Sequence, residues 1–251
     1  MTNIYNSGKL KASGKATGTF YFKHFGVKDD RSTMKVGTDA VLLGAAVDVA
    51  GAASILDIGT GCGVIALILA QRSDALIEAI DIDEESVKQA KENVVKSPWK
   101  ERINVINVSL QDYTDVCSKK YDLIVSNPPY FSNSLKSPSQ RRNLSRHDHS
   151  LGYDDLIRIA SQILNPNGSF WVILPEVKCE EFIQKAGQNN LFPSRLLYII
   201  PKPNRNIQLV IIRFDKCSVV APVIQTLHIK NENNSYSKEY KNLTGEFYLD
   251  F

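Results

Sequence analysis

Residues 54–63 read SILDIGTGCG, a short apolar run that passes directly into a glycine-rich turn. Residues 64–70 read VIALILA, an unbroken apolar stretch that ends at Gln71. A buried strand, a tight glycine turn and a buried helix in this order are typical of the first unit of a parallel α/β sheet. The turn then lies at the carboxyl end of its strand, which is where open α/β sheets bind their ligands.

Short β-branched runs continue to alternate with amphipathic stretches as far as residue 214. This pattern predicts an α/β protein with a seven-stranded, mostly parallel sheet and helices on both faces. The predicted strands are Ser54–Ile58, Leu76–Asp81, Ile103–Asn107, Tyr121–Val125, Ser169–Leu174, Leu196–Ile200 and Gln208–Phe214. The predicted helices are 37–47, the stretch that starts at Val64, 84–96 with Asp83 as its cap, 153–164 and 176–190.

The connector between the last two strands is too short to hold a crossover helix. It spans residues 201–206 and reads PKPNRN, so the last strand is expected to run antiparallel. This differs from the six-stranded, all-parallel dinucleotide-binding fold. We find no internal repeat and no linker, so residues 20–251 are expected to form a single domain behind a flexible leader, residues 1–19.

The composition is that of a globular protein, with 251 residues of which 43% are hydrophobic and 23% charged. No apolar run approaches the roughly 20 residues that cross a bilayer, and residues 1–15 lack the apolar core of a signal peptide. We therefore expect a cytoplasmic protein without membrane attachment. The net charge of +3 is too small to indicate nucleic-acid binding from composition alone.

Neither a structural disulfide nor a metal centre is expected. The cysteines are far apart and form no CxxC pair: Cys62, Cys117, Cys179 and Cys217. Reduced thiols in the core or in loops fit this spacing better than a zinc cluster. His147 and His149 have no third ligand at a suitable spacing, so this pair is not interpreted as a metal site.

The glycine turn itself carries chemical information. Its spacing is GxGxG (Gly59, Gly61, Gly63) and not the GxGxxG of a pyrophosphate-binding loop, and Asp57 opens it. Glycines let the backbone approach a ligand closely, and a carboxylate can hold a ligand ammonium group or the amides of the loop. A nucleoside that bears methionine fits this turn better than a dinucleotide; the alternative is a glycine turn without a ligand.

Two further acidic residues follow neighbouring strands. Asp81 ends the second strand, 18 positions beyond Gly63, and can accept both hydroxyls of a ribose. A solvated strand end is the alternative for Asp81 alone, but the glycine turn favours the ribose site. After the third strand, Gln111 and Asp112 could place an amide or a carboxylate at an adenine amino group, although both residue types are also common in loops.

A rigid motif follows the fourth strand, where residues 126–130 read SNPPY. Two consecutive prolines fix an extended turn. The Asn127 amide oxygen and the Pro128 carbonyl can then accept the two N–H groups of a planar amino group, whose nitrogen is otherwise a poor nucleophile. Tyr130 can stack on the base, and no strong base is required because the proton becomes acidic only after methylation.

These three elements together resemble the class I S-adenosylmethionine-dependent methyltransferases, which have a Rossmann-like fold, and NPPY marks the branch that modifies planar nitrogens. Four other stretches are similar to the tRNA1(Val) adenine-37 N6-methyltransferase family: FYFKHF at 20–25, KVGTDAVLLGA at 35–45, RHDHSL at 146–151 and YKNLTGEFYL at 240–249. The resemblance implies S-adenosyl-L-methionine as cofactor and tRNA as partner. It also implies that Lys35, Gly37 and Thr38 lie near the methionine end of the cofactor. Thr38 could alternatively be a simple helix cap. For the whole chain, we expect a monomer.

The substrate side is expected in the polar stretch of about 20 residues after Tyr130. Its potentially cationic residues form a plausible phosphate-binding surface, with a solvated loop as the alternative. They are Lys136, Arg141, Arg142, Arg146 and His147. Lys202 and Arg205 can flank the same face, and the aromatic residues Phe20, Phe22 and Phe25 are expected either in a core strand or along the substrate groove.

Other functions are compatible with parts of this pattern. Release-factor glutamine N5-methyltransferases also carry NPPY, but they have a helical domain before the first motif, where this chain has only about 50 residues. Ribosomal guanine N2-methyltransferases usually have a duplicated domain. A non-catalytic RNA-binding module of the same fold is the alternative outside the enzymes, and the intact glycine turn and NPPY argue against it.

Overall fold

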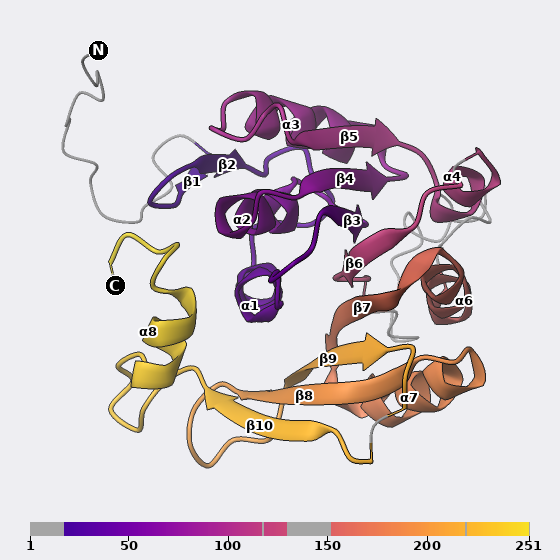
Figure 1. The fold of residues 1–251 in the computed structure, drawn as a ribbon. Helices are drawn as coiled ribbons and strands as arrows, with labels where there is room; N and C mark the ends of the chain where they lie inside the picture. Colours follow the sequence, from indigo (N-terminus) through magenta and orange to yellow (C-terminus); the bar gives the residue numbers. More distant parts are fainter. Residues whose placement is uncertain (1–17, 117, 130–151, 219, 251) are drawn as a thin grey trace, which may run out of the picture.

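A computed structural model describes residues 18–116, 118–129, 152–218 and 220–250 (Figure 1). Within them, an eight-stranded sheet forms the centre of the fold, and a two-stranded hairpin lies outside it. In their order across the sheet, the strands are β10 (Val223–His228), β8 (Phe192–Ile200), β9 (Leu209–Asp215), β7 (Leu164–Pro175), β6 (Tyr121–Ser126), β3 (Ser54–Ile58), β4 (Leu76–Asp81) and β5 (Ile103–Asn107). The hairpin consists of β1 (Thr19–Tyr21) and β2 (Gly26–Lys28).

The sheet is parallel except at β9, which runs antiparallel to both of its neighbours, β7 and β8. This confirms the antiparallel orientation expected from the short 201–206 connector. The structure adds one strand to the predicted seven, because β10 pairs parallel with β8 at the sheet edge. Most side chains of β10 are exposed, so its sequence lacks the apolar pattern by which buried strands are recognised.

Helices cover both faces of the sheet (Figure 1). One face carries α1 (Thr38–Ala46), α2 (Val64–Arg72), α3 (Glu84–Val95) and α8 (Lys238–Thr244). The other carries α4 (Leu110–Val116), α6 (Tyr153–Ile163) and α7 (Cys179–Gln188), the last preceded by the 3-10 turn η1 (Glu176–Lys178). Successive residues of β3 point to opposite faces, with Ile55 in the first core and Leu56 in the second. Among the described residues, none of the helices is long and apolar enough to cross a membrane.

The helix starts follow the predicted capping chemistry in one case and not in the other. Asp83 caps α3, since its side chain accepts a hydrogen bond from the Ser86 amide at 2.8 Å. The interpretation of Thr38 as the cap of α1 is wrong: Gly37 is the N-cap, without a side-chain hydrogen bond, and Thr38 is the first helical residue. Residues 165–168 read NPNG, a sequence typical of a turn, but they lie inside β7, beside a shift of register against β6.

The first and last described segments of the chain pack against each other. Phe22 and Phe25 are buried and stack with ring centroids 4.6 Å apart, and Tyr248 stacks on Phe22 at 6.0 Å. The Lys23 amide donates to the carbonyl of Phe247 at 2.8 Å. Phe22 and Phe25 therefore belong to the core, as one of the two interpretations expected, but they lie between β1 and β2 and not in a core strand. Thr19, predicted to end the leader, already belongs to β1.

Candidate cofactor and catalytic site

The candidate site lies where the order of the strands reverses. The chain continues from β3 outward to β4 and β5, and then returns to place β6 on the other side of β3. In register, Ile58 is paired with Ile80 of β4 and with Ser126 of β6. The glycine turn, Asp81 and Asn127 therefore lie at the carboxyl ends of neighbouring parallel strands. We call this side of the sheet the carboxyl edge. In an open α/β sheet this reversal point is where a ligand crevice forms.

All three glycines of the turn have left-handed backbone angles, with φ of +73° at Gly59, +55° at Gly61 and +84° at Gly63. A Cβ at Gly59 would meet nothing within 4 Å, so this part of the turn faces open space. A Cβ at Gly61 would lie 3.3 Å from the Ser32 hydroxyl oxygen, and one at Gly63 would lie 3.3 Å from Cβ of Ala90. Gly59 thus leaves room for a ligand, whereas Gly61 and Gly63 permit close packing.

Asp57 is completely buried beneath the turn. Its Oδ2 accepts a hydrogen bond from the Thr60 hydroxyl at 2.6 Å, and its Oδ1 has no hydrogen-bond partner among the described residues. Burial raises the pKa of Asp57 to about 7, although the Thr60 hydroxyl and the nearby Ala66 amide favour the charged form; the charge of Asp81 adds to the increase. A buried carboxylate with one unused oxygen is suited to a cationic donor.

Asp81 holds the turn in place through its two carboxylate oxygens. Its Oδ2 accepts from the Gly61 amide at 2.8 Å, and its Oδ1 accepts from the Asp83 amide at 2.9 Å. Burial raises the pKa of Asp81 and the charge of Asp83 adds to this, while the hydrogen bonds from the Asp83 and Gly61 amides oppose it. Each oxygen retains a further acceptor site, so the carboxylate can still receive hydroxyl groups.

Residues 28–36 cross the glycine turn, and we call this segment the strap; the sequence connected only its Lys35 with the site. Asn93 of α3 holds one end of it, since its Oδ1 accepts from the Lys28 amide at 2.9 Å and its Nδ2 donates to the Lys28 carbonyl at 2.8 Å. The same Nδ2 donates to the Cys62 carbonyl in the turn at 2.9 Å. Asn93 therefore joins the strap, the turn and α3 in one network.

Residues predicted near the methionine end of the cofactor lie at the other end of the strap. The Lys35 amino group donates to the carbonyls of Asp29 and Asp30, and the Val36 amide donates to the Asp29 carboxylate at 3.0 Å. Gly37 and Thr38 follow at the start of α1. Lys35 thus closes the strap on itself.

Asp112 is placed at the beginning of α4, one strand away from Asp81. Its carboxylate accepts a hydrogen bond from the Ser109 hydroxyl at 2.7 Å. The backbone amide of Asp112 donates to the hydroxyl oxygen of Ser109 at 3.0 Å. The side chain is exposed. Gln111 donates to Asp155 of α6 at 3.2 Å, so the structure gives it a role between two helices.

The motif predicted to be catalytic follows β6 directly. The Ser126 hydroxyl donates to the Ile58 carbonyl at 2.9 Å, which ties the start of the motif to the end of β3. Asn127 is half-buried, Pro128 is buried and Pro129 is exposed. The remaining predicted members of the site lie outside the described residues, and these are Tyr130, Lys136, Arg141, Arg142, Arg146 and His147.

The described thiols and acidic residues do not suggest another chemistry at this edge. Cys62, in the glycine turn, is buried, and burial raises the pKa of its thiol to about 12, so it remains protonated and unreactive. Cys179 is also buried and Cys217 is exposed. Within the described ranges, no group of three His, Cys, Asp or Glu side chains could hold a metal ion.

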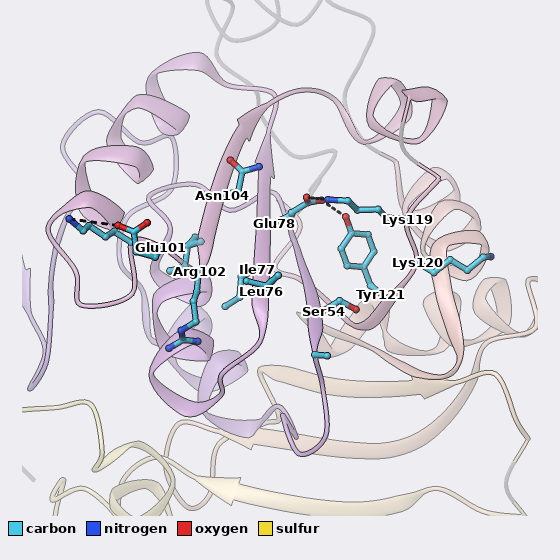
Figure 2. Close-up of a pocket in the computed structure, with 13 residues that line it drawn as sticks. Ser54, Leu76, Ile77, Glu78, Glu101, Arg102, Asn104, Lys119, Lys120 and Tyr121 are labelled. Atoms are coloured by element: carbon cyan, nitrogen blue, oxygen red, sulfur yellow. Dashed lines mark hydrogen bonds and ion pairs between the residues drawn. The ribbon is translucent and has the colours of Figure 1, made fainter.

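A separate hollow lies on the opposite side of the sheet, where the parallel strands begin (Figure 2). We call this side the amino edge. Glu78 of β4 accepts hydrogen bonds there from Lys119, Tyr113 and Tyr121. Burial raises the pKa of Glu78, but these three hydrogen bonds together lower it below its usual range. The carboxylate is therefore held by the protein itself, and this hollow lies away from the glycine turn.

The comparisons with known proteins agree with this geometry. A family model described as "Methyltransferase small domain" matches residues 31–191. The tRNA1(Val) (adenine(37)-N6)-methyltransferase of Phocaeicola vulgatus is 47% identical over 232 residues, which cover 92% of this chain and 97% of that protein. The protein of the same name from Parabacteroides distasonis is 44% identical over 92% of this chain and 97% of its own length.

The fold is also similar to that of a solved structure, a predicted O-methyltransferase from Agrobacterium tumefaciens. Its TM-score is 0.65 with 19% sequence identity, and the match covers 83% of this chain and 96% of that one. This likeness supports the methyltransferase fold alone. The sequence identity to full-length relatives decides the family: the chain belongs to the tRNA1(Val) (adenine(37)-N6)-methyltransferases.

Proposed function

We propose that the protein transfers the methyl group of S-adenosyl-L-methionine to N6 of adenine 37 in tRNA1(Val). One observation carries the proposal: the Ser126 hydroxyl joins the start of the Asn127-Pro128-Pro129 motif to the strand that ends in the glycine turn. A methyl donor on the turn and an amino group at Asn127 would therefore lie beside each other. The choice of tRNA1(Val) and of adenine 37 follows the names of the relatives given above.

The residues at the strand ends fit the proposed cofactor. Asp57 has one buried oxygen without a partner among the described residues, which suits the cofactor's ammonium group. Asp81 retains acceptor sites for the ribose hydroxyls, and the open space at Gly59 leaves room for the ligand beside Gly61. Asp112 would contact the adenine of the cofactor, and Lys35, Gly37 and Thr38 would surround its methionine end. The bound cofactor supplies an electrophilic methyl group on a sulfonium.

The chain's own residues activate the acceptor. The Asn127 side-chain oxygen and the Pro128 carbonyl accept the two N–H groups of the adenine amino group, which shifts electron density toward N6. The new N–C bond forms as the bond from methyl to sulfur breaks, and the proton leaves N6 for water after the transfer. The motif needs no strong base, and its two prolines keep both acceptors in fixed positions. Tyr130 would stack on the adenine ring.

The proposal is tested by incubating the protein with labelled S-adenosylmethionine and total tRNA from a strain that lacks the enzyme. We expect N6-methyladenosine in the nucleoside mass profile, confined to tRNA1(Val) at position 37. A release factor incubated in parallel tests glutamine methylation. No methylation of any tRNA would contradict the proposal.

Asn127→Ala tests the role of the acceptor pair. We expect turnover to fall by at least about 100-fold, while the Kd for the cofactor in calorimetry changes by less than about threefold. Asn104→Ala, at an exposed position of β5, is the matched control and should retain full activity. Equal losses of turnover and cofactor binding in Asn127→Ala would show that Asn127 supports the cofactor site instead.

A further inference from the structure

An aromatic hollow of about 260 Å³ lies between β1, the start of α1 and the C-terminal segment around α8. Figure 1 shows α8 beside α1 on this side of the molecule. The residues that the argument uses are Phe20, Tyr21, Thr38, Tyr236, Tyr240 and Tyr248. We call this site the aromatic hollow; the proposed function uses Gly37 and Thr38 of its lining but none of its aromatic rings.

The rings of the aromatic hollow divide into a floor and a rim. Tyr240 is buried and stacks on Tyr236, with ring centroids 5.2 Å apart and an interplanar angle of 18°. Tyr248 lies 6.3 Å from Tyr240. At the rim, Tyr21 is 46% exposed and Tyr236 is 42% exposed, so each presents part of its ring to solvent. A floor that is already packed, with exposed rings above it, is suited to stacking on a flat partner.

The aromatic hollow lies next to the candidate site. Met34 of the strap lies against Gly61, where a Cβ would be 3.7 Å from Cβ of Met34. Val36, only two residues further on, lines the aromatic hollow together with Thr38. Two residues of extended chain span at most about 7 Å. The hollow is therefore adjacent to the strap at the edge that carries the glycine turn.

A basic surface adjoins it on the other side. A second hollow is lined by the 201–206 connector, with Lys202 and Arg205, and by Lys230. The Lys230 ammonium lies 5.6 Å from the ring centroid of Tyr236, so the two hollows meet at this pair. Residues that line the aromatic hollow, all of them described, include Asp250 and no Lys or Arg. Phosphates would thus be held in the basic hollow, and a neutral flat group in the aromatic one.

We propose that the aromatic hollow binds one unstacked nucleobase of the tRNA anticodon loop, a neighbour of the adenine that is methylated. This inference rests on the proposed function, because it requires an RNA at this edge. The volume of the aromatic hollow is large enough for one base, and aromatic side chains commonly stack on the bases of single-stranded loops. Stacking accepts any base by its π face, so the site would anchor the loop and orient the target without reading its sequence.

The test uses anticodon stem-loop RNAs in which each loop nucleotide other than the target is replaced, one at a time, by an abasic residue. Fluorescence anisotropy gives the Kd of each RNA for the native chain and for Tyr236→Ala. We expect one abasic position to weaken binding to the native protein about tenfold. Tyr236→Ala should bind the intact RNA about tenfold more weakly than the native chain does. For this variant, the RNA with that one abasic position should bind no more weakly than the intact RNA.

Two variants act as controls. Tyr236→Phe keeps the ring and should bind the intact RNA with an affinity close to that of the native chain. Ile224→Ala, at a 63% exposed position of β10, should leave all affinities unchanged. Unaltered melting temperature and cofactor affinity in Tyr236→Ala show that the variant is folded.

The inference is overturned if no abasic position weakens binding to the native chain more than the others do. It is also overturned if, at every abasic position, the loss of affinity caused by Tyr236→Ala and the loss caused by the abasic residue multiply, because the two changes then act independently. Failure of the proposed function is a different result, since the native chain would then methylate no tRNA at all. Methylation of the intact stem-loop by the native chain, without coupling between Tyr236 and any loop position, removes the inference and leaves the proposed function standing.

Discussion

At the scale of single residues, the candidate site depends on two carboxylates with different tasks. Both oxygens of Asp81 already hold backbone amides, so this residue shapes the turn before any ligand arrives. Asp57 uses only Oδ2 in the described structure and keeps Oδ1 buried without a partner. A buried acceptor without a donor lowers stability, and we interpret it as a cost that the cofactor's ammonium group would remove.

Asp57→Asn is predicted to change how stability depends on pH. Burial raises the pKa of Asp57 to about 7 in the folded chain, above its value of 3.8 when exposed. The folded state therefore holds the proton more tightly, and stability falls as the pH rises from about 4 to about 7. We expect the native chain to lose about 2–4 kcal/mol over this range and the variant to lose less. Urea unfolding at pH 5 and at pH 8, without cofactor, measures the difference; parallel changes in both proteins would contradict the prediction.

Gly59→Ala and Gly51→Ala form a matched pair at the glycine turn and away from it. Both glycines have nearly the same left-handed angle, +73° and +74°, and a Cβ would meet nothing within 4 Å at either. We expect similar destabilisation of about 1–2 kcal/mol. Only Gly59→Ala would fill the space assigned to the cofactor, so only it should weaken cofactor binding, by tenfold or more in calorimetry. Unchanged affinity in Gly59→Ala would place the ligand elsewhere.

At the scale of elements, the buried strands were predictable and the strap was not. β3, β4 and β5 have the predicted bounds, because buried apolar side chains recur along each of them. The antiparallel β9 followed from the length of a connector. The strap is held instead by polar side chains of α3, whose partners are 53 to 65 positions away in sequence. Spacing along one chain carries no signal for such contacts, so Asn93 could not be identified as part of the site.

Asn93→Ala is predicted to loosen the strap. The substitution leaves the Lys28 amide and the carbonyls of Lys28 and Cys62 without their partner in a largely buried place. We expect a loss of about 2–3 kcal/mol in the free energy of unfolding and a weaker affinity for the cofactor. Asn104→Ala removes an exposed asparagine from β5 and should change stability by less than about 0.5 kcal/mol. Equal stability of the two variants would refute the role assigned to Asn93.

At the scale of the whole molecule, the two edges of the sheet differ in the residues that they present. The carboxyl edge carries the glycine turn, Asp81, Asn127 and the basic hollow, whereas in the hollow at the amino edge the protein's own side chains hold the Glu78 carboxylate. The sequence indicated this edge because the motifs follow the strands. It did not indicate β10 or the aromatic hollow, since β10 is mostly exposed and the hollow is assembled from residues near both ends of the chain.

The double variant Lys202→Gln, Arg205→Gln tests which edge meets the RNA. We expect tRNA affinity at low salt to fall by about tenfold or more, and the slope of log Kd against log salt to decrease by between one and two. Lys100→Gln, Lys120→Gln removes the same charge at the amino edge and should leave both quantities nearly unchanged. Equal losses in the two double variants would indicate attraction by net charge alone.

The contact between Lys23 and Phe247 has a consequence for synthesis on the ribosome. The β1–β2 hairpin is translated early relative to its partner, because the residues that cover Phe22 follow more than 200 codons later. The central strands can pair while this corner still lacks its partners, so its assembly is expected to be the last step of folding. A nascent chain would thus pair its central strands first and complete its aromatic corner afterwards.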